Sequence, residues 1–176
     1  MRFTPALPLI AALALAACSD DADAELTDEA LSEEEVASIE DNGEMPAPGE
    51  YTTSEELIEF DAPGLDDAKL AEARNAFAEG AAEPLLFCIT EETTREQWLS
   101  AITEANCTLS RLSADGNNLD GVMQCSAEEG LNGRIEVSGT AGADGSDLRM
   151  NIPVQTQAGE GTARIRVRSE RVGDCG

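Results

Sequence analysis

Alternation of apolar and polar side chains at every second residue is the feature of this sequence that most limits its fold. It recurs in four segments after Cys107, separated by short runs rich in Gly, Asn and Asp that are typical of turns. The inward set comprises Leu119, Gly121, Met123 and Cys125; Leu131, Gly133, Ile135, Val137 and Gly139; Leu148, Met150, Ile152 and Val154; and Ala163, Ile165, Val167 and Ser169. A period of two indicates strands with one buried and one solvated face. Together with the stretch beginning at Cys107, these segments predict a five-stranded antiparallel meander.

Three further elements are expected upstream of this meander. Residues 51–60 hold β-branched and aromatic residues typical of a strand, which would be the sixth. Residues 65–80 have apolar residues at helical spacing, and a second helix is expected from a Thr90 cap to about Thr103. Its apolar face would be formed by Trp98, Ala101 and Ile102. The predicted class is therefore α+β: an antiparallel β-meander of five to six strands, with two helices covering one face or edge.

The first 17 residues indicate export. One basic residue precedes an apolar run that is too short to cross a bilayer, which is typical of a signal peptide. The sequence LAAC, residues 15–18, resembles the lipobox of bacterial lipoproteins. In that family the cysteine thiol receives a diacylglycerol, the chain is cut before the cysteine, and the new amine is acylated. The alternative is an ordinary signal peptide followed by a chance cysteine.

Lipidation of Cys18 would place the protein in the cell envelope as a periplasmic lipoprotein. Three acyl chains exceed the two signals needed for stable membrane anchoring. Ser19 follows the cysteine, and by resemblance to sorting in enteric bacteria this favours the outer membrane.

Residues 18–48 are expected to form an acidic tether between the lipid and a domain at 49–176. The chain has a net charge of −25, and residues 19–50 contain 13 acidic residues and no basic one. Such a segment buries too little apolar surface to offset the entropy of ordering it. A weak helix is expected at residues 31–40, where Ser32 and Glu35 fit a capping box. This acidity argues against a nucleic-acid partner.

Four cysteines besides Cys18 predict two disulfides, because an even number in an exported chain is typical of a disulfide framework. Cys125 falls in the inward set of its segment, and Cys175 has the same parity as the inward residues of the last segment. We therefore expect a Cys125–Cys175 bridge and, by elimination, a Cys88–Cys107 bridge. Without histidine or a CxxC spacing, no metal site and no cofactor are predicted.

Arginines gather on the outward positions of the last three strands. They are Arg134, Arg149, Arg164, Arg166 and Arg168. One interpretation is a solvated sheet face with cross-strand ion pairs. The other is a face that binds anions, either an acidic polymer or the chain's own tether.

Catalysis is not expected. The absence of histidine removes the commonest general base and the Ser/His and Cys/His nucleophile pairs. Adjacent carboxylates are frequent, but most lie in expected turns or first helical turns, where solvation or capping explains them.

Several motifs in the expected domain resemble one family. They are PGEYTTSEELIEFDAPG, FCITEE, a cysteine at 107, MQCS and RVRSERVGDC, which together cover residues 49–175. The resemblance is to the domain of unknown function family 3617, small exported proteins of proteobacteria of which several are lipoproteins. Many relatives have methionine-rich strands, whereas only Met123 and Met150 lie in the strand region here. The resemblance implies a periplasmic domain and no known activity.

Two classes of function remain. The first is a non-enzymatic envelope lipoprotein with a structural role or an envelope protein partner. The second is a small-ligand or cation-binding module, in which the acidic tether or a pocket between helices and sheet holds the ligand.

Overall fold

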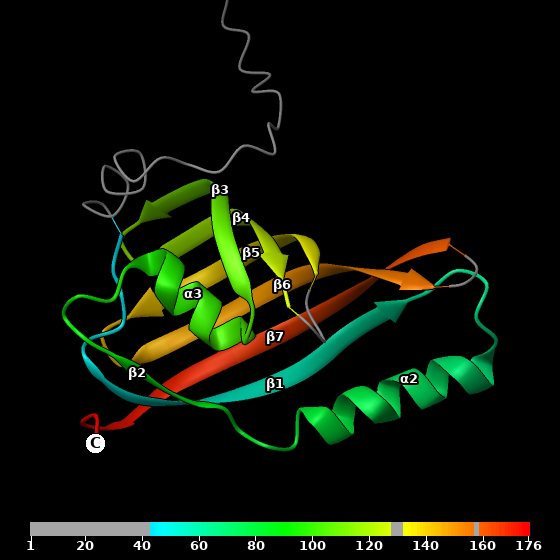
Figure 1. Ribbon diagram of the computed structural model, residues 1–176, viewed down its shortest axis with the longest axis horizontal. Helices are drawn as coiled ribbons and strands as arrows, with labels where there is room; N and C mark the ends of the chain where they lie inside the picture. Colours follow the sequence, from blue (N-terminus) through cyan, green and yellow to red (C-terminus); the bar gives the residue numbers. More distant parts are fainter. Residues whose placement is uncertain (1–42, 128–131, 157–158) are drawn as a thin grey trace, which may run out of the picture.

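The computed structural model describes residues 43–127, 132–156 and 159–176. In these ranges seven antiparallel strands form one curled sheet, and two helices lie against it (Figure 1). The elements are β1 (Gly49–Asp61), α2 (Asp67–Gly80), β2 (Leu86–Ile89), α3 (Arg95–Thr103), β3 (Asn106–Asp115), β4 (Asn118–Ser126), β5 (Gly133–Gly142), β6 (Gly145–Thr156) and β7 (Gly159–Gly173). The predicted α+β class is confirmed, with more strands than expected.

The strand order is β2-β1-β7-β6-β5-β4-β3. Strands β3 to β7 are neighbours in chain order, so the meander predicted from the alternation is confirmed. Strand β1 pairs along β7, from Glu50 opposite Gly173 to Asp61 opposite Thr162, and this brings the start of the domain beside its end. The extra strand is β2, which was not expected because four residues show too little alternation to be counted.

The core lies between α3 and the concave face of the sheet (Figure 1). Leu148 and Met150 of β6 are fully buried there, as is Trp98 of α3. Each large apolar side chain buried in this way contributes about 1.5–3 kcal/mol relative to an exposed one. The single tryptophan is therefore a central packing residue, as the apolar face of the predicted helix indicated.

Helix α3 begins four residues later than expected, because Thr94 caps it and not Thr90. The Gln97 amide donates to the Thr94 hydroxyl over 3.2 Å, and the Thr94 amide donates to the Gln97 side chain over 2.9 Å. This reciprocal capping box satisfies two amides at the helix start. Thr90 instead forms a turn with Thr93, whose amide donates to the Thr90 carbonyl.

Helix α3 also covers the edge of the sheet at β3. The backbone amide of Leu109 donates to the Glu96 carboxylate over 2.9 Å, and that of Cys107 donates to the Ser100 hydroxyl over 3.2 Å. Unpaired strand amides at a sheet edge invite pairing with other chains. Two side chains of α3 thus satisfy edge donors of β3.

Helix α2 begins two residues later than the predicted segment 65–80, with Asp66 as its cap accepting from the Lys69 amide. It runs beside β1 without burying any of its side chains (Figure 1). Phe77 packs on the core while remaining half-buried. The helix consequently contacts the sheet through few side chains and leaves space beneath it.

The segment before β1 is held on the domain by several contacts. The buried Arg95 donates to the carbonyls of Gly43 and Glu44 over 3.0 and 3.2 Å, and the Glu44 amide donates to Gly116. The Tyr51 hydroxyl lies 2.6 Å from the Ala47 carbonyl oxygen. The last residues of the expected tether therefore contact the domain. Cys18, the signal peptide and the helix expected at 31–40 lie outside the described residues.

Candidate functional site

The two disulfides join Cys88 to Cys175 and Cys107 to Cys125. The predicted pairing of Cys125 with Cys175 and of Cys88 with Cys107 is wrong. All four cysteines take part, as expected, but with the other partners.

The strand order explains the correction. Cys107 and Cys125 face each other directly in the register of β3 and β4. Two strands, β5 and β6, separate β4 from β7, so Cys125 lies far from the end of the chain. Strand β7 ends at Gly173, and parity argued from its inward residues does not extend to Cys175. Cys175 instead reaches Cys88 on β2, beyond the edge of β1.

The five arginines share the outer face of the sheet, as their parity predicts, but carboxylates lie among them. Arg164 pairs with Glu59 over 2.8 Å, and Arg168 lies 3.8 Å from Glu56. Arg149 lies opposite Arg166 in the register of β6 and β7. Arg134, farther along β5, lies opposite Gln124 of β4.

Asp147 of β6 is the centre of this charged face. Arg166 donates to both of its carboxylate oxygens, one bond measuring 2.7 Å, and the Arg168 Nε lies 3.6 Å away. The hydrogen bond from Arg166 is the main cause that holds the pKa of Asp147 below its usual value, and the charges of Arg166, Arg168 and Arg149 act in the same direction. Arg164, Arg166 and Arg168 are thus in cross-strand ion pairs, as the first interpretation of this face expects.

A groove with a largely apolar lining lies beneath α2. A cavity of about 690 Å³ lies between α2, the end of α3 and the concave face of the sheet, and a neighbouring cavity of about 510 Å³ continues it between α2 and β1. We call the two together the α2 groove. Its apolar lining is formed by Leu57, Phe60, Phe77, Ile152, Val154, Ala163 and Ile165. Cavities of about 300–1,000 Å³ are typical of small-molecule sites.

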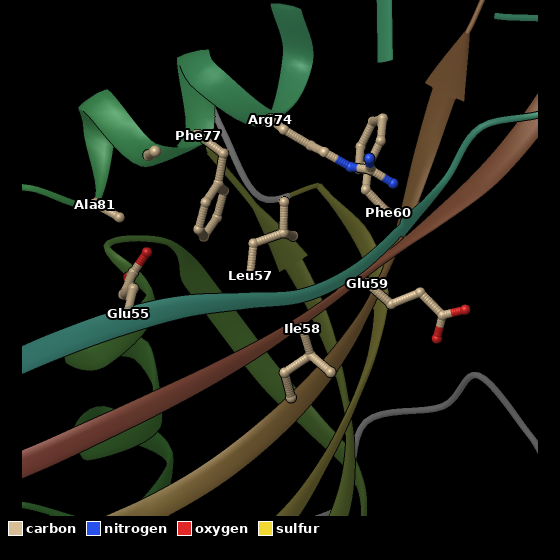
Figure 2. A pocket seen from close by; sticks show the side chains of 9 residues that line it. Glu55, Leu57, Ile58, Glu59, Phe60, Arg74, Phe77 and Ala81 are labelled. Atoms are coloured by element: carbon tan, nitrogen blue, oxygen red, sulfur yellow. The ribbon is translucent and has the colours of Figure 1, made fainter. Parts of the chain in front are cut away.

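A bulge in β1 shapes the groove. Leu57 lies opposite Ile165 and Phe60 opposite Ala163, so Ile58 is the extra residue and both large side chains stay on the inner face. Figure 2 shows Leu57 and Phe77 pointing toward each other across the groove, with Ile58 on the other side of β1. The bulge thus presents two apolar side chains, two and five residues after Glu55, to the same space.

Glu55 is the charged member of the inner face of β1. It follows the buried Tyr51 and Thr53 at the same parity and lies opposite the buried Val167. Its side chain rises toward the C-terminal end of α2, near Ala81 (Figure 2). Among the described residues, no hydrogen bond or ion pair to the Glu55 carboxylate is present.

Glu55 is exposed, but the protein atoms around its carboxyl partly desolvate it and raise its pKa, and the nearby negative charge of Glu104 raises it further. Glu104 is the left-handed residue that ends α3, with a φ of 50°, and both carboxylates line the larger cavity. Helix α2 adds to this negative potential, because its last turn carries no basic residue and its C-terminal end has a partial negative charge. The groove therefore has an electronegative end.

The α2 groove was anticipated only as a pocket between helices and sheet, without residues. The signal that identifies Glu55 was present in the sequence, since parity from Tyr51 places it on the inner face. The imperfect alternation of residues 51–60 reflects the bulge at Ile58, and the side chains of β6 that complete the groove are brought there only by the sheet.

Across residues 43–127, 132–156 and 159–176, no group of three or more metal-ligating side chains is close enough to hold a metal ion. In the same part of the chain, no helix has the length and apolar character needed to cross a membrane.

A family model described as protein of unknown function, DUF3617, matches residues 46–175. The chain belongs to this family. The resemblance found in the sequence motifs is thus confirmed, and the DUF3617 match contains both disulfides and the α2 groove. No curated protein matches the chain. No solved structure matches it either.

Proposed function

We propose that this DUF3617 protein is a periplasmic lipoprotein, anchored by acylated Cys18, whose domain acts by binding and not by catalysis. The sequence LAAC and the disulfide framework support an exported and oxidising location. Ser19 supports the outer membrane as the destination. The complete absence of histidine supports a role without acid–base chemistry.

The observation that carries the binding role is the α2 groove. A half-buried phenylalanine on a helix with no buried side chain faces apolar residues of β1, β6 and β7 across an open space. Leaving such a surface open costs apolar burial, and a bound molecule would recover that burial. The small-ligand alternative derived from the sequence is therefore the form of binding that the geometry supports best.

Anchoring and binding are tested separately. Metabolic labelling with palmitate, followed by mass spectrometry of the mature protein, should find acyl groups on Cys18 and none in a Cys18→Ser variant. An unmodified Cys18 would disprove the anchor. Binding should appear as a rise in melting temperature with apolar molecules at concentrations near their dissociation constants. No shift with any apolar compound would argue against the groove as a binding site.

A protein partner is the second candidate. Strand β2 forms one edge of the sheet and exposes 60% of Leu86, and an added strand from a partner would pair there. Cross-linking in cells from position 86, compared with the exposed position 72 on α2, would identify such a partner. Products at both positions would show no preference for the edge.

A further inference from the structure

The two ends of the α2 groove differ in charge, and this difference defines its ligand. If the groove binds as proposed above, its apolar lining and the position of Glu55 together determine the chemical class of the bound molecule.

The middle of the groove suits an apolar chain. Phe60 and Phe77 line both cavities, and Ile152 and Val154 of β6 extend the lining of the larger one. This strip starts at Glu55, which also lines both cavities, and continues beyond the bulge in β1. A flexible hydrocarbon chain would gain about 0.8 kcal/mol for each methylene that it buries.

The Glu55 end suits a positive charge. Glu55 is the charged residue on the inner face of β1, where Thr53 is the other polar residue. Glu104 brings a second negative charge to the same cavity. Within the described residues, no basic side chain lines this larger cavity. A bound cation would be attracted by both carboxylates and by the negative end of α2.

The opposite end offers less to an anion. Arg74 of α2 lies beside Phe60 and lines the smaller cavity, whereas the Glu59 side chain points to the other side of β1 and pairs with Arg164 (Figure 2). An anionic head would therefore meet one guanidinium at this end, while a cationic head at the other end would meet the two carboxylates of Glu55 and Glu104. The charge distribution favours one orientation, with the head beside Glu55 and the chain toward Phe60.

We infer that the α2 groove binds an amphiphile that joins an apolar chain to a positively charged head, with the head beside Glu55. The predicted class is a long-chain amine and not a fatty acid or a sulfate ester.

Isothermal titration calorimetry with three compounds that share a twelve-carbon chain tests this inference. Dodecylammonium, dodecyl maltoside and dodecyl sulfate are titrated, below their micelle concentrations, into the complete chain carrying Cys18→Ser. We expect dodecylammonium to bind about tenfold more tightly than dodecyl maltoside, since a charge-assisted contact is worth roughly a factor of ten. Dodecyl sulfate should bind most weakly.

Two matched variants identify the contact. Glu55→Gln should reduce the preference for dodecylammonium to about twofold, a residual set by Glu104 alone. Glu72→Gln removes the same charge from an exposed position of α2 outside the groove and should retain the full preference. This control corrects for the attraction between any cation and a protein with a net charge of −25.

Two further variants test the chain site. Phe77→Ser removes lining and Ala73→Phe fills the groove, so both should weaken all three compounds. If all three compounds bind with equal affinity, and that affinity falls in these two variants, the groove is the binding site but the preference for a cation is wrong. Absence of saturable binding, or binding that none of the variants changes, would overturn both. Circular dichroism confirms the fold of each variant.

Discussion

Cys88 and Cys175 are bonded across the end of β1, with their Cα atoms 5.8 Å apart and a sequence separation of 87. The bond ties the four-residue edge strand β2 to the last residues of the chain. Strand β1 lies between β2 and β7, so this bridge crosses the end of β1 and joins the edge strand to the segment that follows β7. The other bridge joins adjacent strands of the meander.

Mild reductant should open Cys88–Cys175 before Cys107–Cys125. Both residues of the first bridge are exposed, whereas Cys107 and Cys125 expose only 5% and 2% of their surface. A thiolate must reach a sulfur to attack it, so access controls the order. Timed alkylation and peptide mapping measure it. Simultaneous labelling of all four cysteines would show that the domain opens as one unit before either bond is reduced.

Removing the bridge that closes the longer loop should cost more stability, because the entropy of loop closure rises with the logarithm of loop length. The chain-entropy relation gives about 4.5 kcal/mol for a separation of 87 residues and about 3 kcal/mol for 18. The variants Cys88→Ala/Cys175→Ala and Cys107→Ala/Cys125→Ala should therefore lose stability in that order in urea unfolding. A larger loss in the second variant would mean that packing around the buried bridge outweighs loop entropy.

Asp147 should contribute to stability at neutral pH and not in acid. Its folded pKa is lowered, chiefly by the hydrogen bond from Arg166, so its contribution is present above the unfolded pKa and is lost as the pH falls through the folded value. Asp147→Asn should cost about 1 kcal/mol at pH 7, as expected for a networked surface pair. Melting curves from pH 7 to pH 2 should show the difference from wild type shrinking toward zero. A pH-independent difference would indicate a packing effect.

Alternation predicted the meander because each of its strands has one wet and one buried face over at least four residues. The disulfides were not predictable in the same way. Parity states which face a cysteine occupies, but pairing also requires the strand order. The predicted meander already placed β5 and β6 between β4 and β7, which argues against a Cys125–Cys175 bridge, whereas nothing in the sequence shows that β1 pairs with β7 and that β2 lies beyond β1.

The start of α3 was also predicted incorrectly, in this case for a local reason. Thr90 and Thr94 are both threonines followed by polar residues, and only Thr94 has Gln97 three residues later to complete a capping box. The groove depends on spacing between elements that are far apart in the chain. Glu55 and Phe77 meet there because α2 follows β1 closely, a relation that propensity does not encode.

Glu55 should destabilise the unliganded domain when it is ionised. Its folded pKa is raised by partial desolvation and by Glu104, so stability falls as the pH rises from the unfolded pKa through the folded one. Glu55→Gln should therefore raise the melting temperature at pH 7, with little gain near pH 3. Glu72→Gln, at an exposed site on the outside of α2, serves as the control for net charge. An equal gain in both variants would assign the effect to the overall acidity of the chain.

Gly139 should tolerate alanine far less well than Gly159. Both have a positive φ, 154° and 140°, which costs an alanine about 1 kcal/mol. A methyl group at Gly139 would overlap the backbone carbonyl of Asp147 on β6, whereas none of the described atoms lies within 4 Å of one at Gly159. We expect losses of about 3 kcal/mol or more for Gly139→Ala and about 1 kcal/mol for Gly159→Ala. Urea unfolding measures both. Equal losses would mean that the sheet relaxes around residue 139 and that backbone conformation alone requires glycine there.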